Sequence, residues 1–223
     1  MILEYHRPET LEEALKLLAR TDPPTRPLGG GAVVSRSRGD DYAVVDVQRL
    51  GLSKIERQGN LLSIGASASL QNLYECPDLQ PALREVVRLE TSYNLRQTAT
   101  LAGVLVCADG KSLLAAALLA LDARLIWQPD QVEIGLGDYL PMRSSWTGGL
   151  LMVEIRVPVQ AGLLYDYVAR TPDDRPIACV AVARWPGGRT RIAAGGPGNA
   201  PVLAMDGLDA GGADTAVQNA YTH

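Results

Sequence analysis

Residues 95–121 read LRQTATLAGVLVCADGKSLLAAALLAL, and the composition changes within this stretch. The first part is rich in small residues. Residues 113–121 are apolar throughout and follow Ser112, a residue type that commonly caps helices. A helix with almost no polar face must be covered by other elements on most sides. We therefore expect a buried helix over residues 113–121.

The small residues before this helix allow two interpretations. Free amides and a helix terminus in residues 98–105 could face the phosphate or the sugar of a ligand. Alternatively, the small side chains only let this segment pass close beneath a neighbouring layer. Both interpretations stay open from this segment alone.

A second small-residue segment lies near the amino terminus, where residues 26–34 read RPLGGGAVV. Residues without a Cβ let backbone amides approach an anion and let the chain take positive φ, so diphosphate is the natural ligand of such a loop. The spacing is not the G-x-G-x-x-G of a Rossmann fold, because Val34 stands where the third glycine is required. The three glycines can equally form a tight turn with no ligand.

The remaining segments up to residue 158 alternate between helical and extended patterns. Thr10 and Glu13 have the spacing of a capping box, which predicts that a helix starts there. The sequence further predicts helices at 69–73 and 81–90. It predicts strands at 43–47, 61–66, 124–127 and 150–157.

The last part of the chain has the pattern of an antiparallel sheet. Residues 163–170, 177–184 and 189–194 are strand-like, and Trp185-Pro186-Gly187-Gly188 between the last two is typical of a hairpin turn. Residues 215–221 could start a helix, for which the sequence shows no partner. The pattern as a whole predicts an α+β protein.

Composition excludes several classes of function. The chain has 223 residues, 47% hydrophobic and 21% charged, which is typical of a globular protein. The net charge is −4 and no basic cluster is present, so we do not expect nucleic acid as a partner. The two histidines stand at positions 6 and 223, and the three cysteines are widely spaced. This pattern predicts no catalytic triad, no metal site and no disulfide framework.

The sequence gives no sign of export or of a membrane span. The amino terminus, MILEYHRPET, lacks the basic stretch and apolar run of a secretory signal. The apolar run at 113–121 is far shorter than the ~20 residues needed to cross a bilayer. The expected location is the cytoplasm.

Taken in order, these pieces resemble the FAD-binding (medium) subunit of the molybdenum hydroxylases, the family of xanthine dehydrogenase and carbon monoxide dehydrogenase. Residues 27–31 look like the first flavin loop of this family, residues 95–103 like the second, and residues 170–176 like its carboxy-terminal pattern. The resemblance covers almost the whole chain. It implies a two-lobed FAD-binding fold of the PCMH type, with lobes at 1–52 and 53–158 and a short antiparallel-sheet domain at 159–223 that is truncated relative to the family.

The resemblance also implies a function. Such a subunit binds FAD and passes electrons from the iron–sulfur clusters of a 2Fe-2S small subunit to an external acceptor, while the molybdenum cofactor lies on a large subunit. The flavin carries the redox chemistry, so no catalytic residue or metal ligand is expected in this chain. The residues that the resemblance places at the cofactor are Leu28, Gly29, Gly30, Gly31, Ala32, Val33, Thr100, Ala102, Gly103, Val104, Cys107 and Asp109.

The chain departs from the family pattern at several of these positions. Ala102 replaces a glycine, Val104 replaces an asparagine and Ala32 replaces a threonine or serine. Leu113 stands near the place of a carboxylate that can hold the ribose or the adenine side, for which Asp109 could substitute. Losing three contacts of about 1 kcal/mol each would weaken binding on the order of a hundredfold.

These departures support a second hypothesis of a different class. The chain could retain the fold, have lost FAD, and serve as a scaffold or assembly subunit. That hypothesis predicts a colourless protein, whereas the flavoprotein hypothesis predicts a yellow one.

Overall fold

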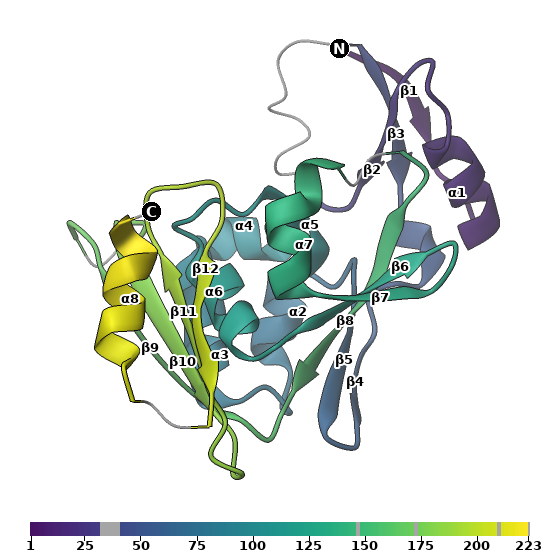
Figure 1. Ribbon diagram of the computed structural model, residues 1–223. Coiled ribbons are helices and arrows are strands. Elements are labelled where there is room, and N and C mark those ends of the chain that lie inside the picture. Colours follow the sequence, from purple (N-terminus) through teal and green to yellow (C-terminus); the bar gives the residue numbers. More distant parts are fainter. Residues whose placement is uncertain (32–40, 146–147, 172–173, 209–210, 223) are drawn as a thin grey trace.

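The computed structural model describes residues 1–31, 41–145, 148–171, 174–208 and 211–222 (Figure 1). The chain begins with a parallel sheet in the order β1-β3-β2, in which β3 is central. The elements of this lobe are β1 (Ile2–His6), α1 (Leu11–Leu18), β2 (Thr25–Leu28), β3 (Tyr42–Asp46) and the 3-10 turn η2 (Gln48–Leu50). Helix α1 packs against β2 and β3, toward which it buries Ala14 and Leu18.

The predicted start of α1 is confirmed. Thr10 Oγ1 accepts a hydrogen bond from the amide of Glu13 at 3.2 Å, as in a capping box. The returning bond differs from the expected one, because the Glu13 carboxylate accepts from the amide of Glu9.

The second sheet is antiparallel and has the order β4-β5-β8-β6-β7. Its strands are β4 (Ile55–Gln58), β5 (Leu61–Gly65), β6 (Arg124–Gln128), β7 (Val132–Gly135) and β8 (Leu151–Pro158). The helices of this part are α2 (Leu70–Glu75), α3 (Pro81–Glu90), α4 (Tyr93–Thr98), α5 (Leu101–Cys107), α6 (Leu113–Ala120) and α7 (Leu136–Met142), with the turn η3 (Arg143–Ser145). Strands β4 and β7 and helix α7 were not predicted, and the small-residue segment forms the two short helices α4 and α5.

The third sheet is antiparallel with the order β12-β11-β10-β9. Its strands are β9 (Gly162–Val168), β10 (Ala178–Arg184), β11 (Thr190–Gly195) and β12 (Val202–Gly207). The predicted hairpin between β10 and β11 is confirmed. The amide of Trp185 donates to the Arg189 carbonyl, and the amide of Gly188 donates to the Trp185 carbonyl, both at 2.9 Å.

The helix that the sequence indicated at residues 215–221 is present, and the structure shows the partner that the sequence did not. Helix α8 (Ala213–Thr222) has a partner, because it packs against β11 and β12. The Tyr221 hydroxyl donates to the carbonyls of Cys179 at 2.7 Å and Gly195 at 3.1 Å. Hydrogen bonds of this kind join residues far apart in the chain, so no local sequence pattern predicts them.

Helix α6 lies at the centre of the molecule, as the apolar stretch predicts. All eight of its residues are buried, and Ser112 caps it by accepting a hydrogen bond from the amide of Ala115 at 3.1 Å. One side of α6 packs against α3 and the other against β10 and β11. A single hydrophobic core therefore runs from Leu62 in the second sheet to Ala193 in the third.

The first lobe has a small core of its own, formed by Ala14, Leu18, Val45 and Val47 together with Leu151 of β8. In Figure 1 this lobe and the third sheet lie at opposite ends of the molecule, with the helices of the middle part between them. In the part of the chain that the structure describes, no helix combines the length and the apolar character needed to cross a bilayer.

Candidate functional site

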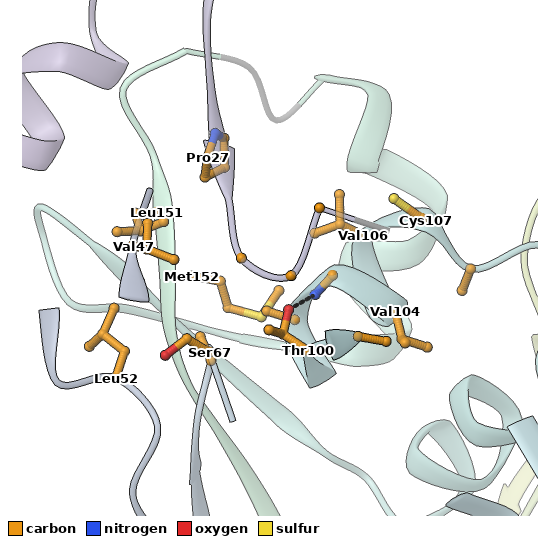
Figure 2. Close-up of a pocket in the computed structure, with 18 of the residues that line it drawn as sticks. Pro27, Val47, Leu52, Ser67, Thr100, Val104, Val106, Cys107, Leu151 and Met152 are labelled. Atoms are coloured by element: carbon orange, nitrogen blue, oxygen red, sulfur yellow. Dashed lines mark hydrogen bonds between the residues drawn. The ribbon is translucent and has the colours of Figure 1, made fainter. Parts of the chain in front are cut away.

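A cavity of about 400 Å³ lies where the first lobe meets the second, which is within the roughly 300–1,000 Å³ range of ligand pockets. Figure 2 shows Val47, Leu52 and Leu151 on one side of it and Val106 and Cys107 on the other. The first side is enclosed, since Val47 and Leu151 are almost completely buried. The other side is open, because Val106 and Cys107 are exposed to solvent.

The glycine loop after β2 packs directly against the segment between α4 and α5. A Cβ on Gly30 would lie 1.5 Å from the Thr98 carbonyl oxygen, and one on Gly29 would lie 2.8 Å from Thr100 Oγ1. Gly31 has a φ of +74°, a conformation that glycine adopts without strain. The glycines are therefore required for the contact between the two loops, and the same contact brings their backbone to the cavity wall.

The second loop is held by hydrogen bonds within the protein. The amides of Leu101 and Ala102 donate to the carbonyls of Ala68 and Ala66 at 3.0 and 3.2 Å. Thr100 Oγ1 accepts from the amide of Gly103 at 3.2 Å, the bond drawn in Figure 2. These three amides already have acceptors within the protein, which favours the close-packing interpretation of this segment over the one in which they face a phosphate.

A half-buried carboxylate completes the start of α6. Glu90, the last residue of α3, accepts from the Ser112 hydroxyl at 2.9 Å and from the amide of Leu114 at 3.0 Å. Burial raises the pKa of Glu90, and the two hydrogen bonds only partly oppose that shift. Glu90 also lines the cavity. Sequence reasoning missed it because 24 residues separate it from Leu114.

Asp109 is engaged in an ion pair. Arg175 donates to both of its carboxylate oxygens, at 2.8 and 2.9 Å. Burial alone would raise the pKa of Asp109, but the Arg175 guanidinium outweighs it and lowers that pKa. Arg175 lines the cavity, whereas Asp109 lies outside its lining. The geometry therefore gives no support to Asp109 as a substitute for the missing carboxylate.

Most of the cofactor residues that the resemblance suggested come together at this cavity. Leu28 and Asp109 are not among the lining residues, and Ala32 and Val33 lie outside the described part of the chain. The suggested cofactor residues that do line the cavity are Gly29, Gly30, Gly31, Thr100, Ala102, Gly103, Val104 and Cys107. The sequence did not indicate the apolar wall, to which Val47, Leu52, Trp127, Leu151 and Met152 contribute.

The cavity has the properties of a binding site without a nucleophile or a metal of its own. Neighbouring protein atoms partly desolvate the Cys107 sulfur although the residue is exposed, and this raises the pKa of Cys107 and disfavours the thiolate that a reactive cysteine needs. Among the described residues, no group of three or more His, Cys, Asp or Glu side chains could hold a metal ion. Apolar walls with a few polar groups are suited to a small ligand that carries both apolar and polar parts.

Residues 1–160 match the family model described as the FAD binding domain in molybdopterin dehydrogenase. The chain belongs to this family. Some of the proteins that it resembles are named as chains of dehydrogenases. The glyceraldehyde dehydrogenase medium chain of Sulfolobus acidocaldarius is 29% identical over 221 residues, which cover 91% of this chain and 78% of that protein.

Another relative is the uncharacterized protein YgfM of Escherichia coli K12, 30% identical over 142 residues. The match covers 63% of this chain and 54% of YgfM, so the chain spans about half the length of that relative.

Solved structures of the family share the fold. Carbon monoxide dehydrogenase of Hydrogenophaga pseudoflava, in a form that lacks the Mo-pyranopterin moiety, superposes with a TM-score of 0.76 at 25% identity and covers 92% of this chain and 78% of that chain. Quinoline 2-oxidoreductase of Pseudomonas putida 86 superposes with a TM-score of 0.83 at 22% identity, covering 99% and 86%. These superpositions confirm the predicted α+β fold with its carboxy-terminal antiparallel sheet.

Proposed function

We propose that this chain is the FAD-binding electron-transfer subunit of a molybdenum hydroxylase. It would work with a large subunit that carries the molybdenum cofactor and a small subunit that carries 2Fe-2S clusters. The observation that carries the proposal is the close contact of the Gly29–Gly30 loop with Thr98 and Thr100, which forms one wall of the cavity in a chain of the FAD-binding family.

The residues at the cavity fit the cofactor in two ways. Gly29 and Gly30 present bare backbone at the cavity wall, so a diphosphate can approach it without meeting side chains. Val47, Leu52 and Leu151 form an apolar wall against which a flat ring can pack. Bound FAD supplies the redox chemistry, and the protein positions it and excludes water.

The open side of the cavity suits electron exchange with a partner. Val106 and Cys107 are exposed there, and Arg175 lines the same cavity. A redox group near exposed residues can be reached by a docked donor or acceptor, whereas one behind Val47 and Leu151 could not.

A second candidate function is a scaffold or assembly subunit without flavin. It is favoured by the internal hydrogen bonds of the Leu101, Ala102 and Gly103 amides and by the hydrocarbon side chain of Val104 in the cavity lining. Under this alternative the loops hold the two lobes together and no longer bind a ligand.

The test is the visible absorbance spectrum of the purified protein, recorded before and after addition of FAD and gel filtration. We expect flavin bands that remain with the protein at close to one FAD per chain. A colourless protein that does not retain FAD, alone or co-expressed with the two partner subunits, would contradict the proposal and favour the scaffold.

A further inference from the structure

One polar group of the cavity has no assigned role in binding. Among the described residues that line the cavity, Glu90 carries the only carboxylate. Glu90 extends from the end of α3 and lies close to Arg175 and Asp109. The charge of Arg175 favours the ionised form of Glu90, and the charge of Asp109 opposes it. Cys179 is the other titratable neighbour, and its pKa is raised to about 12 by burial and by the nearby carboxylates.

Glu90 accepts two hydrogen bonds from the described part of the chain. One carboxylate oxygen accepts from Ser112 Oγ and the other from the amide of Leu114. An ionised carboxylate offers about four acceptor sites, so each oxygen can accept from a further donor. Because burial disfavours its charge, additional donors from a ligand would stabilise it strongly.

We infer that Glu90 binds the neighbouring hydroxyl groups of a polyol in the cavity, namely the ribityl chain or the ribose of the dinucleotide. This inference rests on the proposed function. In its ionised form, which donors from a ligand would favour, the Glu90 carboxylate repels phosphate and offers acceptors only, so it selects a donor group of the ligand. Two neighbouring hydroxyls match two adjacent carboxylate oxygens, whereas a single ring N–H would engage only one.

The experiment compares FAD binding to the ligand-free wild-type chain and to two variants of α3. Glu90→Gln keeps the size of the side chain and removes its charge. Glu85→Gln is the matched control, because Glu85 pairs with Arg88 on the surface of the same helix. We expect Glu90→Gln to bind FAD about tenfold to a hundredfold more weakly, the loss typical of a hydrogen bond to a charged group, and Glu85→Gln to bind like the wild type.

A third variant separates binding from a general loss of stability. Thr10→Ala removes the cap of α1, and Thr10 neither lines the cavity nor is a hydrogen-bond partner of Glu90. We expect it to lower the melting temperature of the ligand-free chain with little change in FAD affinity. If Glu90→Gln does not fold, Glu90→Asp, which keeps the charge on a shorter side chain, is expected to weaken FAD binding by a smaller factor.

The ligands ADP and FMN then identify the polyol. A loss confined to ADP assigns the adenosine ribose, and a loss confined to FMN assigns the ribityl chain. The inference is overturned if Glu90→Gln, or Glu90→Asp in its place, binds FAD like the wild type, or if Thr10→Ala weakens FAD binding as much. A wild-type chain that never binds FAD instead contradicts the proposed function itself.

Discussion

Gly30 provides the most direct test of the contact between the two loops. We expect Gly30→Ala to lower the free energy of unfolding by about 3 kcal/mol, because the new methyl group would lie 1.5 Å from the Thr98 carbonyl oxygen and force two backbones apart. FAD uptake should be lost with it, since the loops form the cavity wall. Urea denaturation of the purified variant measures the first effect, and the absorbance after FAD addition measures the second.

The control for this substitution is Gly187→Ala in the hairpin turn between β10 and β11. A Cβ on Gly187 would meet nothing within 4 Å, so we expect a change within about 0.5 kcal/mol. Equal urea midpoints for the two variants would mean that the loops are not in contact.

At the scale of single residues, the sequence predicted the interactions that are local in the chain. The caps by Thr10 and Ser112 join residues three positions apart, and the structure confirms both. The contact of Glu90 with Leu114 and the pairing of Arg175 with Asp109 span 24 and 66 residues. No local pattern marks such pairs, because the fold alone brings their partners together.

Among the elements, the end of α6 is joined to the third sheet by a cluster of charges. Arg191 lies between Asp206, at 2.6 Å, and Asp122, at 3.2 Å, and also donates to the Leu119 carbonyl at 3.1 Å. Its side chain is only 7% exposed, so these bonds are shielded from water. We expect Arg191→Met to lower the free energy of unfolding by about 3 kcal/mol. The reason is that the carboxylates of Asp122 and Asp206 would lose a positively charged partner in a site shielded from water.

Arg124→Met is the matched control for the charge cluster. Arg124 also pairs with Asp122, but at 3.9 Å and with a side chain that is 45% exposed. Exposed pairs contribute roughly 0–1 kcal/mol, so we expect a small change. Chemical denaturation of both variants makes the comparison, and equal losses would show that burial of Arg191 does not strengthen the cluster.

The elements that sequence reasoning found and missed differ in the strength of their local signals. Helix α6 combines a cap with an apolar run, and the turn at residues 185–188 carries Pro and Gly. Helices α4 and α5 are only six and seven residues long, too short for a helical period to show. Strand β12 is an edge strand without strict alternation of buried and exposed residues.

For the whole molecule, the order of the motifs predicted the fold better than any single element did. The division at residues 52 and 158 stays a prediction, and each of the three sheets lies within one of its ranges. The hydrophobic cores are arranged differently, because the main core crosses residue 158 and includes Leu62, Leu118 and Ala193. Packing across the whole chain was not visible in the sequence, since it depends on which faces meet.

The shared core makes a prediction about fragments. We expect a fragment of residues 1–158 to lose cooperative unfolding and to expose apolar surface, because α6 would lose its cover by β10 and β11. A fragment of residues 53–223 keeps the main core and should unfold cooperatively. Near-ultraviolet circular dichroism and urea titration of both fragments make the comparison. Cooperative unfolding of the 1–158 fragment would show instead that α3 and the second sheet cover α6 sufficiently, and that the two lobes around the cavity fold without the third sheet.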